Sequence, residues 1–195
     1  MTRSVAAAVM AIGLAILASA TPAVAQPART IGYRVLATTK TSTMEKEMND
    51  AAASGLQFGG VIGGETAAAG EEVVVVMARS AESTGHFQYK LLATNRTSTM
   101  QKELQDAGDA GFEYRGHTVF KSVFSGEEVV IILERDRDAP IHPYQYRLLA
   151  TSKTGTMDKE LAGAAESGFE FVGLTLGKTA VGGRELVVIT RRDAR

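Results

Sequence analysis

The sequence repeats one stretch three times: YRVLATTKTSTMEKEMNDAAASG at residues 33–55, YKLLATNRTSTMQKELQDAGDAG at 89–111 and YRLLATSKTGTMDKELAGAAESG at 146–168. Each copy then continues to an apolar run, EEVVVVMAR, EEVVIILER or RELVVITRR. The copies align without a gap, which indicates three structural units of one kind. We take these units as residues 33–80, 89–136 and 146–193.

Each unit begins with a short segment of β-branched, leucine and aromatic residues that predicts a strand, at residues 33–38, 89–94 and 146–151. A helix is expected next. Ser42 is followed three residues later by Glu45, and Ser98 by Gln101, which is the spacing of a capping box. We therefore place Ser42 and Ser98 at the N-caps, with Gly155 as a weaker substitute in the third unit.

The expected helices carry one narrow apolar face and end at a glycine. Gly55, Gly111 and Gly168 stand where a left-handed cap is wanted. The apolar positions recur at helical spacing. They are Met44, Met48, Ala51 and Ala52, then Met100, Leu104, Ala107 and Gly108, then Met157, Leu161, Ala164 and Ala165.

Two further strands complete each unit. The first has bulky residues at alternate positions, such as Phe112 and Tyr114, and the second is a continuous apolar run, such as residues 129–133. A run of that kind suits the middle of a sheet. We therefore predict an α+β fold of three tandem β-α-β-β units. In each, an antiparallel sheet has the third strand between the first and the second, and one helix covers one face.

A unit of this size has a small core and open strand edges. Both features favour pairing of units. Because three units do not divide into pairs, we expect two to pair within the chain and the third to pair with another chain, which makes a homo-oligomer.

Residues 1–25 have the pattern of a signal peptide. Arg3 precedes an apolar run at residues 5–20, and Ala23-Val24-Ala25 provides a cleavage site. We expect a periplasmic or secreted mature protein without a membrane span. Removal of Arg3 leaves 20 of the 21 basic residues against 22 acidic ones, a net charge of −2. Such an even balance argues against a nucleic-acid partner.

The strand and turn residues resemble a small bacterial β-α-β-β family that is catalogued as a domain of unknown function. The resemblance lies in YKLL at residues 89–92 with GFEY at 111–114, and in YRLL at 146–149 with GFEF at 168–171. This chain has Phe or Leu after the glycine where that family would have Trp. The resemblance implies the fold and no activity. The topology is also similar to that of dodecin-like flavin binders, which motivates a flavin-like ligand as one alternative.

The sequence contains no motif that demands catalysis. His86, His117 and His142 fall at non-equivalent positions, without the spacing of a metal site, and the chain has no cysteine. We interpret the histidines as surface or hydrogen-bonded residues. We expect no enzyme activity, no metal and no cofactor.

The loop before each helix is a candidate anion site. It combines a cation and hydroxyls with the free N–H groups of a helix N-terminus. Capping alone also explains the hydroxyls. The residues are Lys40, Ser42 and Thr43, then Arg96, Ser98 and Thr99, then Lys153, Thr154 and Thr156.

The first tyrosine of each unit allows two interpretations. Tyr33, Tyr89 and Tyr146 are either core residues, the commoner case at alternate strand positions, or stacking platforms for a flat ligand. Our leading functional hypothesis is a non-enzymatic interaction module that binds a protein or a cell-envelope component. The alternative is a binder of a small flavin-like or anionic ligand at unit interfaces or helix N-termini.

Overall fold

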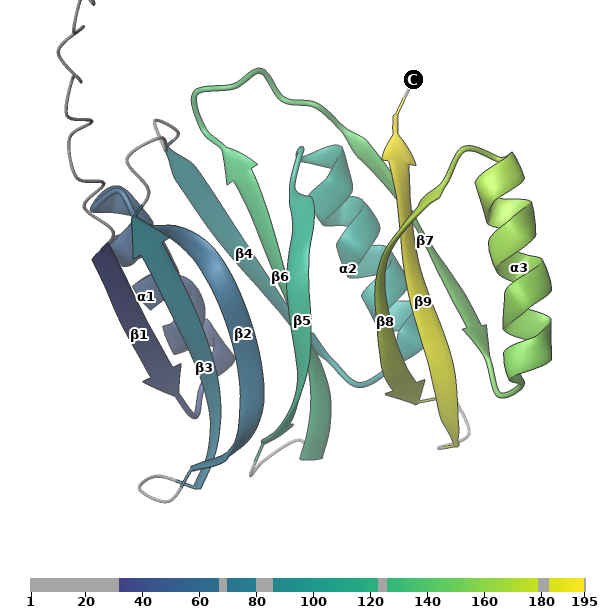
Figure 1. Cartoon of the computed structure of the whole chain (residues 1–195), viewed down its shortest axis with the longest axis horizontal. Helices are drawn as coiled ribbons and strands as arrows, with labels where there is room; N and C mark the ends of the chain where they lie inside the picture. The colour runs from purple at the N-terminus through teal and green to yellow at the C-terminus, as the bar shows by residue number, and fades with distance from the viewer. Residues whose placement is uncertain (1–31, 67–69, 80–85, 123–125, 179–182, 195) are drawn as a thin grey trace, which may run out of the picture.

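The structure is a computed structural model that describes residues 32–66, 70–79, 86–122, 126–178 and 183–194 (Figure 1). Residues 1–25, the predicted signal peptide, lie outside this part. Unit 1 consists of β1 (Gly32–Thr38), α1 (Thr41–Ala53), β2 (Gln57–Thr66) and β3 (Gly70–Arg79). Unit 2 consists of β4 (Phe87–Thr94), α2 (Thr97–Asp109), β5 (Glu113–Ser122) and β6 (Gly126–Asp136). Unit 3 consists of β7 (Tyr144–Thr151), α3 (Thr154–Glu166), β8 (Glu170–Lys178) and β9 (Arg184–Asp193).

Each unit is a three-stranded antiparallel sheet with its last strand in the centre. The strand orders are β1-β3-β2, β4-β6-β5 and β7-β9-β8, as predicted. A bulge interrupts the second strand of each unit at the same place, between Phe58 and Gly60 in unit 1. The α+β fold with three tandem units is confirmed.

The predicted glycine caps are also confirmed. Gly55, Gly111 and Gly168 have φ values of 81°, 79° and 78°, a region that side chains with a Cβ rarely occupy. An arginine of the central strand reinforces this corner. Arg135 Nη1 donates to the carbonyl oxygen of Ala110 at 3.0 Å, and Arg192 Nη1 donates to that of Ser167 at 2.7 Å.

The predicted capping boxes are wrong. The N-caps are Lys40, Arg96 and Lys153, and none of their side chains makes a capping hydrogen bond. Ser42 and Ser98 lie inside the first turn and are exposed. Threonines that precede the helices order these corners instead, because Thr38 Oγ1 accepts from Lys40 N at 3.2 Å and Thr151 Oγ1 accepts from Lys153 N at 3.1 Å.

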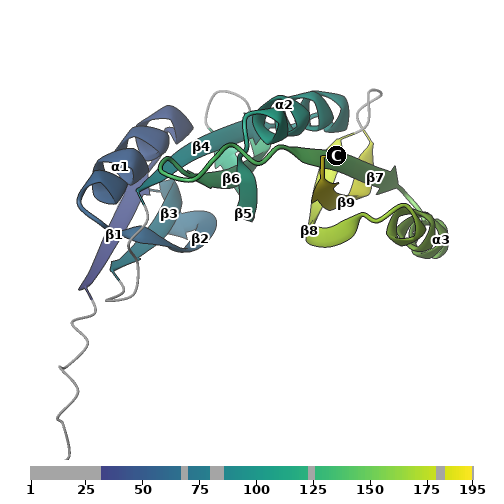
Figure 2. The same cartoon turned by 90° about the horizontal axis from the view of Figure 1, so that it is seen from above.

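The units follow one another along the long axis of the molecule in a curved row, with α1 and α2 on its upper side and α3 at its far end (Figure 2). Unit 2 contacts unit 1 through α1, β2 and β3, and it contacts unit 3 through α2, β5 and β6. The predicted pairwise packing inside the chain is therefore replaced by serial packing. Unit 2 uses one face toward unit 1 and a different face toward unit 3.

Candidate functional site

Two contacts of the same design connect the units, and we call them joint 1 (units 1 and 2) and joint 2 (units 2 and 3). In each of them the first strand of the later unit lies along the helix of the earlier unit. Strand β4 packs against α1 at joint 1, and β7 packs against α2 at joint 2. The outer edge of both strands is thus covered by a helix, which removes the liability of an open edge.

At joint 1, two side chains of α1 take the place of a neighbouring strand. Asn49 Nδ2 donates to the Tyr89 carbonyl at 2.9 Å, and its Oδ1 accepts from Tyr89 N at 3.0 Å. Glu45 Oε2 accepts from Leu91 N at 2.8 Å. Three backbone groups of the strand edge are satisfied in this way.

Joint 2 repeats this arrangement with two glutamines. Gln105 Oε1 accepts from Tyr146 N at 3.0 Å, and Gln105 Nε2 donates to the Tyr144 carbonyl at 3.2 Å. Gln101 Oε1 accepts from Leu148 N at 2.7 Å, and Gln101 Nε2 donates to the Tyr146 carbonyl at 2.9 Å. Glu45 and Gln101, which the sequence assigns to capping boxes, therefore bind the next unit.

The first tyrosine of units 2 and 3 inserts into the preceding unit. Tyr89 is 2 % exposed, and its hydroxyl donates to Glu134 Oε2 at 2.5 Å and accepts from Phe58 N at 2.8 Å. Tyr146 is 3 % exposed, and its hydroxyl donates to the Phe112 carbonyl at 3.0 Å. It also accepts from Tyr114 N at 2.7 Å. Burial raises the pKa of both tyrosines, to about 12 for Tyr146.

An aromatic ring of the earlier unit lies on a glycine of the later unit. A Cβ added to Gly116 would lie 3.3 Å from the Phe58 ring, and one added to Gly173 would lie 2.5 Å from the Tyr114 hydroxyl. These glycines follow the bulges of β5 and β8. Their lack of a side chain therefore lets the two sheets approach each other.

A buried apolar cluster fills each joint. At joint 1, Met44 and Met48 of α1 and residues of β3 pack with Val130 and Ile132 of β6. At joint 2, Met100 and Leu104 of α2 and residues of β6 pack with Val187 and Ile189 of β9. The central strand β6 thus serves both joints, with its alternate side chains directed to opposite faces.

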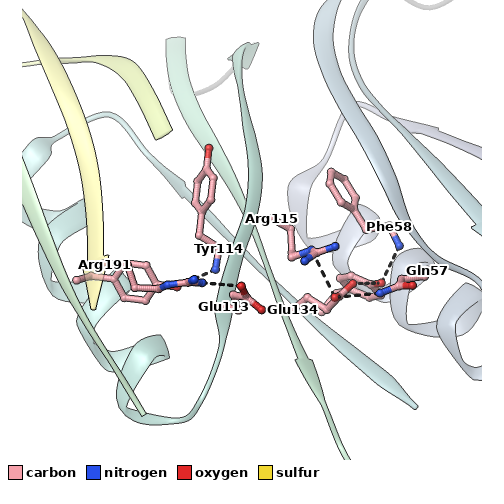
Figure 3. Close-up of polar contacts among 9 residues, drawn as sticks. Gln57, Phe58, Glu113, Tyr114, Arg115, Glu134 and Arg191 are labelled. Carbon is pink, nitrogen blue, oxygen red and sulfur yellow. Dashed lines mark hydrogen bonds and ion pairs between the residues drawn. The ribbon is translucent and has the colours of Figure 1, made fainter. Parts of the chain in front are cut away.

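The polar groups at the rim differ between the joints (Figure 3). At joint 1, Glu134 Oε1 lies 3.3 Å from Gln57 Nε2 and 3.4 Å from Arg115 Nε. At joint 2, Arg191 Nη1 forms an ion pair with Glu113 Oε1 at 2.7 Å. Arg191 stands at the repeat position of Glu134, and Glu113 at that of Gln57. Each joint therefore has its own charge pattern, which favours its own pair of units.

The end of the row in unit 1 exposes the face that units 2 and 3 bury, and we call it the N-face. It consists of Tyr33, Val35, Ile62 and Val76, which are 68 %, 64 %, 67 % and 36 % exposed. Val35 is paired with Val76 in the sheet, and Gly60 is paired with Val76 from the other side. Paired residues lie on the same face. Gly60 stands at the position of Gly116 and Gly173, but a Cβ added there would meet nothing within 4 Å.

The opposite end, in unit 3, exposes the helix-side face that units 1 and 2 bury, and we call it the C-face. It consists of Phe171, Leu174 and Leu176 of β8, which are 60 %, 47 % and 45 % exposed. Helix α3 borders this face. Of its predicted apolar positions, Met157 and Ala164 are buried, whereas Leu161 is half-buried and Ala165 is exposed.

Helix α3 also lacks the side chains that cover a strand edge. Asp158 and Ala162 stand where α1 has Glu45 and Asn49 and α2 has Gln101 and Gln105. This difference between copies is the sequence signal that marks the joints, since Asn49 and Gln105 fit no capping motif and have no counterpart in α3.

The structure keeps the three candidate anion loops apart. Each lies in a different unit, ahead of α1, α2 or α3. Anion binding at these loops stays a prediction. The nine predicted residues are all exposed: Lys40, Ser42, Thr43, Arg96, Ser98, Thr99, Lys153, Thr154 and Thr156.

A cleft of about 380 Å³ opens beside the linker between units 2 and 3. Charged groups of both signs lie along it, and Arg135 is already bound to Gln88 and to the Ala110 carbonyl. The charged or titratable lining residues are Glu113, Glu134, Arg135, Asp136, Arg137, His142 and Tyr144.

The histidines have ordinary partners, as predicted. His86 contacts Asp138, His142 Nε2 lies 3.0 Å from Asp193 Oδ1, and His117 Nδ1 lies 2.6 Å from the Tyr114 hydroxyl. Among the described residues, no three His, Asp or Glu side chains are grouped so that they could hold a metal. In the same part of the chain, no helix is long and apolar enough to cross a membrane.

Comparison of the chain with models of protein families, with curated proteins and with solved structures finds no match in any of the three.

Proposed function

We propose that this chain is a non-enzymatic interaction module, exported to the periplasm or the cell exterior, which binds a protein partner through its N-face. The observation that carries the proposal is the contrast among the three equivalent tyrosines. Tyr89 and Tyr146 are 2 % and 3 % exposed, whereas Tyr33 is 68 % exposed. The N-face thus has the composition of a buried joint, and no part of the chain that the structure describes packs against it as another unit.

The N-face is suited to a protein for two physical reasons. Its exposed apolar side chains are contiguous across three strands, and such patches mark interaction surfaces. In addition, β1 is an edge strand, and the backbone groups of Tyr33 and Val35 are the counterparts of those that α1 binds in β4. An edge of this kind binds partners by main-chain hydrogen bonds.

Site-specific photo-crosslinking tests this function. A photoreactive phenylalanine analogue replaces Val35 in cells that export the chain, and the matched control carries it at Lys102, which is exposed on α2. We expect a discrete protein adduct from position 35 and none from position 102. If position 35 gives no adduct, the proposed function is wrong. Amino-terminal sequencing of the same material should give Gln26 as the first residue if residues 1–25 are a signal peptide.

The second candidate is a small-ligand binder, and the cleft between units 2 and 3 is the observation that favours it. Its volume of about 380 Å³ is in the range of small-molecule sites. The cleft does not favour an anionic ligand, because its lining carries groups of both signs: Arg135, Arg137 and His142 with Glu113, Glu134 and Asp136. Native mass spectrometry of gently purified protein distinguishes the candidates, because a retained small molecule would favour the cleft over the N-face.

A further inference from the structure

The N-face and the C-face are the two halves of one joint. Every joint in the chain places the helix-side face of one unit against the opposite face of the next unit. The C-face is the helix-side face of unit 3, and the N-face is the opposite face of unit 1. We propose that the partner bound at the N-face is the C-face of a second copy of this chain. This inference rests on the proposed function and names its partner.

The aromatic and glycine positions of such a joint are all in place. Phe171 stands at the position of Phe58 and Tyr114, and it is 60 % exposed. Gly60 stands at the position of the glycines on which those rings lie, and the space above it is open. In the joint between copies, the Phe171 ring of one copy therefore lies on Gly60 of the next.

The tyrosine contact can form with backbone groups alone. The hydroxyl of Tyr146 donates to the carbonyl of Phe112 and accepts from the N–H of Tyr114 at joint 2. The corresponding groups at the C-face are the Phe169 carbonyl and the Phe171 N–H. Tyr33 of a second copy carries a hydroxyl at the position from which Tyr146 binds these groups in joint 2.

The two faces carry larger apolar side chains at this contact than the internal joints do. Ile62 of the N-face replaces the threonines that stand at this position in the internal joints, Thr118 and Thr175. Leu176 of the C-face stands at the position of Gly63 and Val119, so both sides of the new contact are larger and more apolar than at joint 1. At joint 1, Gly63 N donates a hydrogen bond to Thr118 Oγ1 at 2.6 Å. In the joint between copies, apolar contact replaces this hydrogen bond.

The joint between copies is weaker than the internal ones. Ala162 cannot reach the β1 edge as Asn49 and Gln105 reach β4 and β7, and Ala78 stands at the position of Glu134 and Arg191, so the rim lacks a charge pair. We therefore expect reversible association that depends on protein concentration. Because the two faces differ, each copy added to an open row again leaves one N-face and one C-face free, unless the row closes on itself. The products are rings or open rows.

Sedimentation velocity of the chain without residues 1–25 tests this arrangement. The variants are Val35→Asp, which blocks the N-face, and Leu174→Asp, which blocks the C-face. Both residues are exposed in the single chain, so the fold is retained, and circular dichroism checks this. Lys102→Glu is the control on an exposed side of α2.

We expect the wild type and Lys102→Glu to associate as concentration rises, and each blocked variant alone to associate at least tenfold more weakly. An equimolar mixture of the two blocked variants should form a 1:1 dimer, since one N-face and one C-face remain intact in the mixture. Wild-type chains that stay monomeric at millimolar concentration overturn the proposal of a second copy. So does a blocked variant that still dimerises alone, because that result indicates a symmetric contact.

These outcomes are separate from a failure of the proposed function. A monomeric wild type together with a crosslink from position 35 to a different protein retains the interaction module and rejects only the second copy. The absence of any crosslink from position 35 rejects the function itself.

Discussion

Strands β1 and β4 have closely similar sequences and opposite surroundings. Tyr33 begins YRVLAT and Tyr89 begins YKLLAT, yet the first tyrosine is 68 % exposed and the second is 2 % exposed. The difference arises outside the strands, because α1 of the preceding unit lies along the outer edge of β4, whereas no helix of a preceding unit covers the outer edge of β1 among the described residues. Whether the first tyrosine of a unit is buried thus depends on the unit that precedes it, and the sequence of a single unit does not specify it.

The largest expected effect comes from removal of the buried tyrosine. Tyr89→Ala should lower the free energy of unfolding by about 3–5 kcal/mol, because it empties a buried site and leaves Glu134 without its hydroxyl partner. Tyr33→Ala is the matched control and should change that free energy by less than about 0.5 kcal/mol. Urea unfolding of both variants measures the difference. Equal losses would show that the two strands are not in different environments.

Alkaline pH should weaken joint 2 by a smaller amount. Burial raises the pKa of Tyr146 to about 12, above the ordinary value of 10.0, so the folded state retains a proton that the unfolded state releases. The stabilisation is complete below pH 10 and is lost as the pH rises toward 12. The loss amounts to about 2–3 kcal/mol at 1.36 kcal/mol per unit.

The variant Tyr146→Phe isolates this effect, because it retains the ring and removes the proton. Unfolding free energies at pH 9, 10, 11 and 12 should fall less steeply for Tyr146→Phe than for the wild type. Parallel curves for the two proteins would contradict the attribution of this loss to the raised pKa of Tyr146. Tyr114, whose pKa burial also raises to about 12, contributes to the slope that remains.

Loss of the edge-covering amide should have an effect of about 2 kcal/mol. Asn49→Ala leaves the N–H and the carbonyl of Tyr89 without their partners, and such unsatisfied groups are costly when buried. The matched change at the other end is Ala162→Asn, which adds the amide where the chain offers no strand to bind. Thermal unfolding should show a loss for the first variant and no loss for the second.

The smallest expected effect concerns the glycines beneath the aromatic rings. Gly173→Ala should cost about 1 kcal/mol, since the added methyl group would lie 2.5 Å from the Tyr114 hydroxyl and must displace it. Gly60→Ala adds the same group into open space and should be tolerated. A similar result for both would mean that the Tyr114 ring moves aside at no cost.

The repeat pattern was sufficient to predict the architecture within each unit. The order of strands follows from the apolar runs at residues 73–77 and 129–133, and the helix ends follow from Gly55, Gly111 and Gly168. These features depend on interactions that are local in sequence or confined to one sheet. A single copy of the repeat already contains them.

The joints could not be predicted in the same way, because they depend on which units face each other. Glu45 and Gln101 satisfy the spacing of a capping box, and their longer-range partners, Leu91 N and Leu148 N, have no signature of their own. The tyrosines show the same limit. The core interpretation is correct for Tyr89 and Tyr146 and wrong for Tyr33, although all three occupy one repeat position.

The serial design of the joints bears on how such a gene can change over generations. If unequal recombination between the repeats deleted or added one unit, the joint that results would still place a helix beside a first strand. A shortened chain that links unit 1 directly to unit 3 would set Asn49 against Tyr146 and Gln57 against Arg191, an amide beside a cation, without a like-charge clash at that pair. Loss of the middle unit would therefore leave both terminal surfaces unchanged.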